Sequence, residues 1–457
     1  MSRLAPVERD ALVALGDLLD EIGYAALYDL SAGGALFPGD RSAARRLADA
    51  LPGEARAVLR LCALDTPVPA GELPVDVGAV ARRLLDAGLA RQEPEGLRLD
   101  DLVVVPVLSG RLLTATPPGW RPPGARSGRG YIGEDSLRLA RALPDAAGRA
   151  VLDVGTGCGI QGLLAARGAA RRVLTDVEER SLALSRLNAV LNRCEDAEVR
   201  AGAGYAPVAG ERFDLIVCLP PYLPALGAGD ATVATGADGL GLLRALLEGA
   251  ADHLVPGGAL VCFAQLLCDD DGPLLARELP ALVRGGVTIS CAAADWSPLH
   301  PYARELGARL VAAGRLPAGL DAHRLVLEAL RGLGATGVAT ATIRAVAPRP
   351  GAGARGARTW VGGGAPRHAG EVYAPAVGLR FGHDQSLRTA VTAEGTSHVL
   401  PGPTAALLAA FDGRCSLDEA ATKAWGAHPD ADARDLLDEA LARAAELERA
   451  GLLTRAG

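Results

Sequence analysis

The chain has 457 residues, with 47 Lys and Arg against 54 Asp and Glu, and a formal net charge of −7 at pH 7. At about 100–200 residues per domain, this length predicts two to four domains. Nucleic-acid-binding proteins usually carry a basic excess, so the acidic balance disfavours a nucleic-acid partner. No apolar run reaches the roughly 18 residues of a membrane span, and the acidic, amphipathic N-terminus is not typical of a signal peptide. We therefore expect a soluble, cytoplasmic protein without a membrane partner.

The eight cysteines predict no metal site. They are scattered between Cys62 and Cys415, with no close pair and no histidine at ligand spacing. Structural zinc needs four ligands at close, regular spacing, whereas buried reduced thiols are common in cytosolic proteins.

Residues 1–117 are predicted to form a helical domain that ends in a hairpin. Residues 54–64 and 77–89 have helical periodicity, and the alternating runs that follow are broken by turn residues. This pattern is winged-helix-like. Because no basic recognition helix is present, we favour a protein-contact or dimerisation module, with a homodimer as one such state, over a DNA-binding one.

Strands and helices alternate in residues 118–347, after a stretch rich in proline and glycine. The predicted strands are 150–154, 172–174, 213–218 and 259–264. The predicted helices are 161–166, 179–192 and 240–254. Since strands separated by helices form parallel sheets, we expect an α/β domain with a doubly wound sheet.

The remaining chain divides into a linker and a further domain. Residues 348–370 are dominated by Gly, Pro and Arg, which is typical of a linker. Residues 371–457 contain three strand-like runs and then three predicted helices.

A glycine-rich turn follows the first predicted strand of the α/β domain. The sequence VLDVGTGCGIQG, residues 151–162, predicts a strand, a tight turn and a helix. Glycines let the backbone approach a ligand, and a helix N-terminus suits a carboxylate. The next strand ends in Asp176, where an acid is placed to accept hydrogen bonds from two ribose hydroxyls.

A second motif, FDLIVCLPPY, covers residues 213–222 and is a buried strand that ends in Pro-Pro-Tyr. Two prolines fix an extended, rigid turn. The motif would therefore hold one backbone carbonyl and one aromatic face at the mouth of the sheet.

In this order, the pieces resemble the class I S-adenosylmethionine-dependent methyltransferases over residues 131–344. They are most similar to the branch with an Asn/Asp/Ser-Pro-Pro-Tyr/Phe motif, which includes protein-glutamine and nucleic-acid amino methyltransferases. LVPGGALV, residues 254–261, matches the family's helix-to-strand turn. The resemblance implies a Rossmann-like core and S-adenosylmethionine as the cofactor, with S-adenosylhomocysteine as its product.

The resemblance also implies which residues bind the cofactor. Asp153 and the glycine turn would hold the methionine end, Asp176 the ribose, and Val177 would pack on the adenine. The family often has an acid near Ala203, so backbone groups would contact the adenine amino group here. The implied cofactor-binding residues are Tyr131, Glu134, Asp153, Gly155, Thr156, Gly157, Cys158, Gly159, Asp176, Val177, Ala203 and Leu219.

The expected catalytic residues are Leu219, Pro220, Pro221 and Tyr222, with His300 and Tyr302 as a polar-aromatic cluster that contacts substrate or is merely structural. Leu219 departs from the family pattern, in which a polar side chain accepts hydrogen bonds from a planar amide or exocyclic amine. Leucine cannot accept them. An aliphatic amine needs this contact less, because its lone pair is available once it is deprotonated, and a carboxylate or hydroxyl oxygen also stays open.

The ribbon and helices of residues 371–457 resemble the RiPP recognition element, the peptide-binding domain of the pyrroloquinoline-quinone peptide chaperone. That domain binds a leader peptide by adding a strand to its sheet. The resemblance implies a precursor peptide as partner. Leu219 and the methyltransferase branch then favour N-methylation of an aliphatic amine, as in peptides of the daptide class. Peptide carboxyl O-methylation, amino-methylation of a nucleic acid or protein amide, a non-enzymatic cofactor-binding regulator and, for this domain, a dimerising winged helix remain alternatives.

Overall fold

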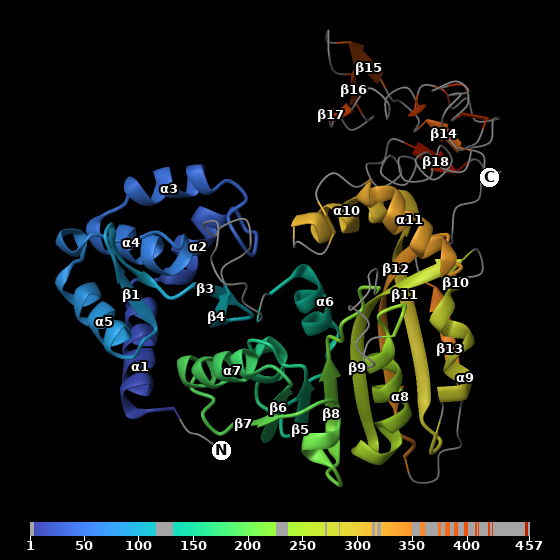
Figure 1. The fold of residues 1–457 in the computed structure, drawn as a ribbon, viewed down its shortest axis with the longest axis horizontal. Helices are drawn as coiled ribbons and strands as arrows, with labels where there is room; N and C mark the ends of the chain where they lie inside the picture. The colour runs from blue at the N-terminus through green and yellow to red at the C-terminus, as the bar shows by residue number, and fades with distance from the viewer. Residues whose placement is uncertain are drawn as a thin grey trace.

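A computed structural model describes most of the chain (Figure 1). The described residues are 4–115, 130, 132–224, 236–269, 272–282, 284–312, 316–317 and 321–349, with short stretches between 357 and 455. Figure 1 shows the N-terminal helical domain on one side and a large sheet on the other, with α7 at their junction.

The N-terminal domain consists of short helices followed by two hairpins. Its helices are α1 (Pro6–Glu21), α2 (Tyr24–Ala32), α3 (Arg41–Asp49), α4 (Gly53–Val58), the π-helical turn η1 (Leu59–Ala63), the 3-10 turn η2 (Ala70–Glu72) and α5 (Val75–Asp86). The hairpins are β1 (Ala90–Glu93) with β2 (Gly96–Leu99), and β3 (Leu102–Val107) with β4 (Gly110–Ala115). Both predicted helices are confirmed, but two separate hairpins replace the single predicted one.

The central sheet has the strand order β13-β11-β12-β9-β8-β5-β6-β7. The strands are β5 (Ala150–Val154), β6 (Arg171–Asp176), β7 (Glu198–Ala201), β8 (Phe213–Cys218), β9 (Leu254–Asp269), β11 (Thr288–Pro298), β12 (Gly337–Val346) and β13 (Ala357–Val361), and β10 (Gly272–Pro273) pairs with β9. The pairs that join β9, β8, β5, β6 and β7 are all parallel. The predicted α/β fold is therefore confirmed.

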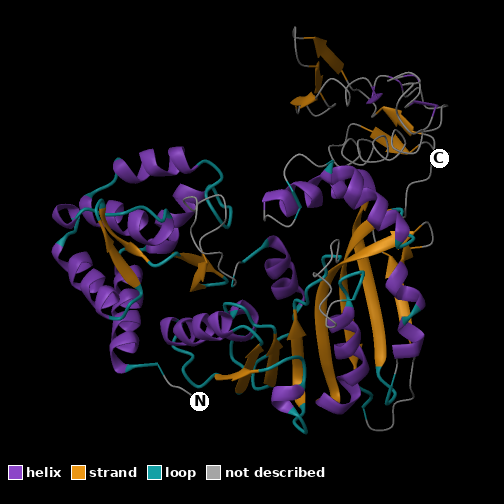
Figure 2. Ribbon diagram, viewed as in Figure 1, coloured by secondary structure: helices purple, strands orange, loops and turns teal. Residues whose placement is uncertain are grey.

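Helices cover both faces of this sheet, as Figure 2 shows. They are α6 (Glu134–Ala142), the π-helical turn η4 (Ile160–Ala165), α7 (Glu179–Leu191), the 3-10 turns η5 (Ala206–Val208) and η6 (Leu274–Arg277), α8 (Gly241–His253), α9 (Leu279–Leu282), α10 (Leu299–Ala312) and α11 (Ala322–Gly332). Among the described residues, no helix is long and apolar enough to cross a membrane.

The predicted strands of this sheet pair in parallel, whereas β12, for which the sequence analysis made no prediction, runs antiparallel to both β9 and β11. The helix pair α10 and α11 joins β11 to β12. After one helix, the chain is back at the end of the sheet where the previous strand began. After two antiparallel helices, it is at the end of the sheet where that strand ended. The next strand must then run in the opposite direction.

The predicted linker also needs a correction. Within residues 348–370, β13 pairs in parallel with β11 at the sheet edge. Its sequence, ARTWV, contains the β-branched and aromatic residues that strands favour, but the surrounding glycines hide this signal.

In the C-terminal part, the three strand-like runs are confirmed as an antiparallel sheet of β15 (Arg380–His383), β16 (Arg388–Val391) and β17 (Ser397–Leu400). In addition, β14 (Tyr373–Pro375) pairs with β18 (Leu453–Arg455). The three helices expected after residue 400 fall almost wholly outside the described residues.

Candidate active site

The glycine loop, residues 155–159, leaves the carboxyl end of β5 in a left-handed backbone conformation. The φ angles of Gly155, Gly157 and Gly159 are 69°, 58° and 89°, which only glycine adopts without strain. A Cβ on Gly155 would meet no atom within 4 Å, and one on Gly157 would meet only Gly130 Cα at 4.0 Å. The loop therefore leaves room for a ligand against its backbone.

Asp153 holds this loop from inside the protein. It is 1% exposed, and its Oδ2 accepts hydrogen bonds from Thr156 Oγ1 at 2.7 Å and from the Gly162 amide at 2.9 Å. Burial is the main cause that raises the Asp153 pKa to about 6. Both Asp153 and the buried Thr156 thus fix the shape of the turn. The family resemblance had implied a further role for them, contact with the methionine end of the cofactor.

Asp176 ends β6 beside the glycine loop. Its Oδ2 accepts from the Gly157 amide at 3.0 Å and its Oδ1 from the Glu178 amide at 2.9 Å. A carboxylate has about four lone-pair sites, so each oxygen retains acceptor capacity. The next residue, Val177, is 65% exposed although it is apolar.

The loop after β7 lies against the same edge of the sheet. The Gly202 amide donates to the Asp176 carbonyl at 2.9 Å, and Ala203 is exposed. A carboxylate, an exposed apolar side chain and a backbone loop are thus brought together, as the sequence predicted for a nucleoside site.

Two polar side chains of α7 support the glycine loop from behind. Ser185 Oγ donates to the Gly157 carbonyl at 3.0 Å, and Asn188 Nδ2 donates to the Cys158 carbonyl at 2.8 Å. Cys158 itself is buried, which raises its pKa to about 12 and keeps the thiol protonated.

Gln161, which sequence reasoning missed, lies in η4 directly after the loop. Its Nε2 donates to the Ser136 carbonyl of α6 at 2.7 Å. Its Oε1 is buried and has no hydrogen-bond partner among the described residues. Such a group is costly unless it is satisfied, so this acceptor fits the amino group of a ligand in the loop.

The segment before β5 is described only in part. Tyr131 lies outside the described residues. Glu134 is exposed and lies 3.6 Å from Arg141 of its own helix, so its carboxylate is turned towards α6 itself.

The Pro-Pro-Tyr motif follows β8 at the same edge. Leu219 and Tyr222 are half-buried, Pro220 is buried and Pro221 is exposed. The Tyr222 hydroxyl donates to Asp135 Oδ2, in the first turn of α6, at 2.6 Å. Burial raises the pKa of Tyr222 well above its ordinary value, and the Asp135 charge adds to this shift, so Tyr222 remains a neutral donor.

Asp135 is a second residue that the sequence analysis missed. It stands in the same YIGEDS segment as Glu134, the acid that the sequence analysis named as a cofactor-binding residue. Nothing local distinguishes the two carboxylates, because the partner of Asp135 is 87 residues away.

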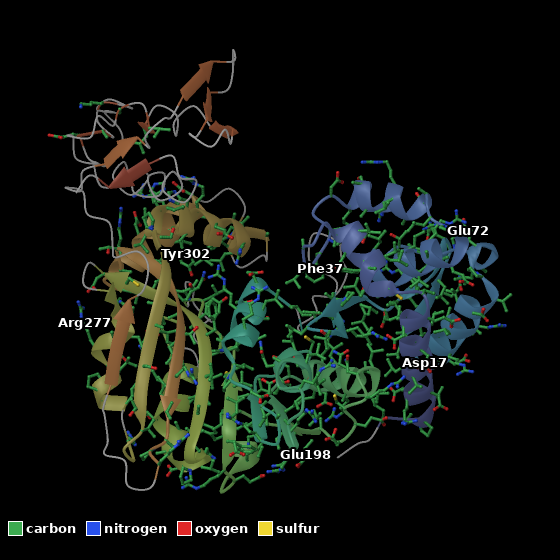
Figure 3. The ribbon with its side chains drawn as sticks, turned by 180° about the vertical axis from the view of Figure 1, so that it is seen from behind. Asp17, Phe37, Glu72, Glu198, Arg277 and Tyr302 are labelled. Atoms are coloured by element: carbon green, nitrogen blue, oxygen red, sulfur yellow. The ribbon has the colours of Figure 1, made fainter. Side chains whose placement is uncertain are left out.

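His300 and Tyr302 both lie on α10, but they have different neighbours. Burial raises the pKa of Tyr302 to about 12, and the charge of its phenolate in turn raises the pKa of Tyr222. Tyr302, labelled in Figure 3, packs against the buried cluster that contains Leu299, Leu306 and Leu327. His300 instead packs on His323 of α11, with ring centroids 4.3 Å apart, and its Nδ1 lies 3.3 Å from Arg304 Nη2.

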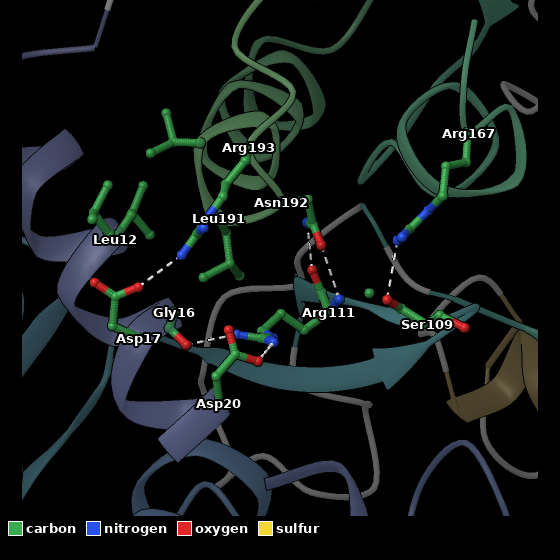
Figure 4. A pocket seen from close by; sticks show the side chains of 13 residues that line it. Leu12, Gly16, Asp17, Asp20, Ser109, Arg111, Arg167, Leu191, Asn192 and Arg193 are labelled. Carbon is green, nitrogen blue, oxygen red and sulfur yellow. Dashed lines mark hydrogen bonds and ion pairs between the residues drawn. The ribbon is translucent and has the colours of Figure 1, made fainter. Parts of the chain in front are cut away.

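A cavity of about 230 Å³ lies elsewhere, between α1, α7 and the turn of the β3–β4 hairpin. Figure 4 shows that the Arg, Asp and Asn side chains in its wall are bonded to one another or to the backbone. The described part of the chain holds no group of three or more His, Cys, Asp or Glu side chains that could bind a metal ion.

Comparison with known proteins agrees with this geometry. Residues 128–270 match the methyltransferase small domain family. A release factor glutamine methyltransferase of Xylella fastidiosa is 40% identical over 131 residues, which are 26% of this chain and 48% of that protein. The chain thus spans about half the length of this relative. A release factor glutamine methyltransferase of Geobacter sulfurreducens is 30% identical over 210 residues, 43% of this chain and 67% of that protein.

The chain belongs to the class I S-adenosylmethionine-dependent methyltransferases. Its cofactor is therefore S-adenosylmethionine, which supplies an electrophilic methyl group on a sulfonium. The open space over Gly155 and the orphan acceptor of Gln161 both fit a bound amino acid moiety. In this methyltransferase, Asp176 and Val177 would hold the nucleoside, while Leu219 and Tyr222 would border the methyl group.

Proposed function

We propose that this methyltransferase N-methylates an aliphatic amine of a ribosomally synthesised peptide. The observation that carries the proposal is the makeup of the Pro-Pro-Tyr end. The apolar Leu219 stands where the resembling branch has a polar acceptor, and the Asp135 carboxylate lies against the Tyr222 hydroxyl. This pairing suits an amine better than a planar amide.

The chemical argument depends on the lone pair of the acceptor nitrogen. The lone pair of an amide is delocalised, so an amide needs a precisely placed hydrogen-bond acceptor, which Leu219 cannot supply. An ammonium is attracted by the Asp135 carboxylate, and the apolar Leu219 favours its neutral form. The ammonium first gives up one proton to solvent. The neutral nitrogen then attacks in line as the S–CH₃ bond breaks, which leaves S-adenosylhomocysteine, and the methylated nitrogen loses a second proton to solvent.

Peptide recognition is assigned to residues 371–457. Support comes from the three-stranded antiparallel sheet of β15, β16 and β17, because an open sheet edge can bind an extended leader peptide as an added strand. Residues 1–117 would serve as a winged-helix-like protein-contact module, including contact with a second copy of the chain.

Methylation of a protein glutamine amide is the second candidate. It is favoured by the names of the relatives, which are glutamine methyltransferases of release factors and, in Bradyrhizobium diazoefficiens, of ribosomal protein uL3. The leucine at position 219 argues against it, because leucine cannot accept a hydrogen bond from the amide.

Methyl transfer to two substrates separates these candidates. The protein would be incubated with S-adenosylmethionine and either a peptide bearing an aliphatic amine or a release factor bearing a glutamine, and the products analysed by mass spectrometry. We expect methylation of the amine only, with a rate that rises from about pH 7 to about pH 9 as the neutral amine becomes more abundant.

The variant Leu219→Asn sharpens the test, with Leu223→Asn as the matched control. Leu223 is 39% exposed just beyond the motif, so its substitution should not matter. Leu219→Asn should not speed methylation of the amine. If instead it raised glutamine methylation, and the unchanged protein had a flat rate between these pH values, the aliphatic-amine proposal would be wrong.

A further inference from the structure

Two asparagines at the C-terminal end of α7 bind the edge of β4 as a neighbouring strand would: Asn188 lies in the last turn and Asn192 directly follows the helix. Asn188 Oδ1 accepts from the Leu113 amide at 2.7 Å, and its Nδ2 donates to the Leu113 carbonyl at 2.9 Å. Asn192 makes the same pair of bonds with Arg111, at 3.0 Å and 2.6 Å. Side-chain amides therefore satisfy four backbone groups of the hairpin.

Helix and strand geometry explain why this arrangement works. Residues four apart on a helix are separated by about 6 Å along its axis. Residues two apart on a strand are separated by roughly 6.8 Å. Asn188 and Asn192 are thus spaced to meet Leu113 and Arg111 in register.

The two asparagines differ in the bond made by their second amide hydrogen. Asn188 Nδ2 donates to the Cys158 carbonyl in the glycine loop at 2.8 Å. Asn192 Nδ2 donates to the Asn188 carbonyl, within its own helix, also at 2.8 Å. Figure 4 shows the Asn192 end of this arrangement, beside Arg111. Of the two asparagines, only Asn188 joins the N-terminal hairpin to the cofactor loop.

We propose that Asn188 is a positioning residue through which the β3–β4 hairpin of the N-terminal domain holds the glycine loop in shape for S-adenosylmethionine. Asn188 is 0% exposed, so water cannot replace either partner if the other is lost. The N-terminal domain then contributes to cofactor affinity through this hydrogen-bond chain. The inference depends on the family's cofactor and not on which substrate is methylated.

Coupling of this kind must act in both directions. If a docked hairpin favours the cofactor-binding shape of the loop, bound cofactor must in turn stabilise the docked hairpin. The backbone amides of residues 110–115 should therefore exchange with solvent more slowly when S-adenosylmethionine is bound.

Three variants of the full-length protein separate the contributions. Asn188→Ala removes both the hairpin contact and the loop contact. Asn192→Ala removes a hairpin contact and a bond to the Asn188 carbonyl but no loop contact, and Ser185→Ala removes a loop contact, to the Gly157 carbonyl. Calorimetry would give the S-adenosylmethionine Kd, and hydrogen exchange would follow residues 110–115 with and without the cofactor. We expect the Kd to rise about tenfold for Asn188→Ala, by a few-fold for Ser185→Ala and by less than about twofold for Asn192→Ala.

Two results would overturn the proposal. One is an equal change of the S-adenosylmethionine Kd in Asn188→Ala and Asn192→Ala, which would show that Asn188 only attaches the hairpin to α7. The other is an exchange rate of residues 110–115 that cofactor leaves unchanged in the unmodified protein. This second measurement decides the matter even if Asn188→Ala does not fold.

Discussion

Among the described residues, the two halves of the candidate site are held by different numbers of side-chain hydrogen bonds. At the glycine loop, Asp153, Asp176 and Asn188 each bind the loop backbone or its flanking residues. At the Pro-Pro-Tyr end, within the part that the structure describes, the motif is held by one side-chain hydrogen bond, from Tyr222 to Asp135. A densely bonded loop fits one invariant cofactor, whereas a lightly bonded end can be altered to suit a different methyl acceptor.

The largest effect is expected at the cofactor half, for Asp176→Ala. If Asp176 binds two ribose hydroxyls, each hydrogen bond to its charge contributes about 1.5–3 kcal/mol, so S-adenosylmethionine affinity should fall by more than about 100-fold. Calorimetry measures the loss. Asp196→Ala is the control, because Asp196 is paired with Arg172 at 3.3 Å in a different contact. Near-normal affinity of Asp176→Ala would remove this residue from the site.

The raised pKa of Asp153 predicts a pH-dependent stability. The folded state binds the proton more tightly than the unfolded state, whose carboxyl titrates near 3.8, so stability falls as pH rises from about 4 to the folded pKa of about 6. The loss should reach about 2–3 kcal/mol and then stay constant.

Asp153→Asn isolates this effect, since it removes the charge but keeps an oxygen acceptor. Urea unfolding of both proteins at pH 4.5 and pH 7 should show the variant gaining stability relative to the unmodified protein at the higher pH. Parallel pH profiles would show that Asp153 is not the group responsible.

Alanine substitutions at two glycines separate the cost of a strained backbone from the loss of space for a ligand. Gly155 and Gly148 have φ angles of 69° and 72°, and a Cβ on either meets no atom within 4 Å. Alanine at either position should cost roughly 1 kcal/mol of stability through the left-handed conformation. Only Gly155→Ala should also weaken S-adenosylmethionine binding, because Gly148 precedes β5 at the opposite edge. Equal affinity in the two variants would argue against ligand contact at Gly155.

The smallest effect is expected at the acceptor half, for Tyr222→Phe. Loss of the hydroxyl frees the Asp135 carboxylate in a half-exposed setting, so kcat/KM should fall only about fivefold to tenfold. The cofactor Kd should not change. Tyr24→Phe is the control: it removes a buried hydroxyl that donates to the Val104 carbonyl at 2.7 Å, and it should lower stability without changing kcat/KM.

Sequence reasoning succeeded where the signal is local. The glycine loop, the acid at the end of β6 and the strand before Pro-Pro-Tyr are short motifs whose spacing fixes their conformation. It made no prediction for β12, whose direction depends on how the pair α10 and α11 returns the chain, and it failed at β13, whose pattern is hidden among glycines.

By itself, the sequence determined the α/β core, the cofactor loop and the absence of a polar acceptor at position 219, because each depends on residues close together in the chain. Only the tertiary structure decided that Asp135, and not Glu134, meets Tyr222, and that Asn188 joins β4 to the glycine loop. Those contacts link residues 87, 75 and 30 positions apart. Distances of this kind are set by how helices and strands pack, and no local pattern records them.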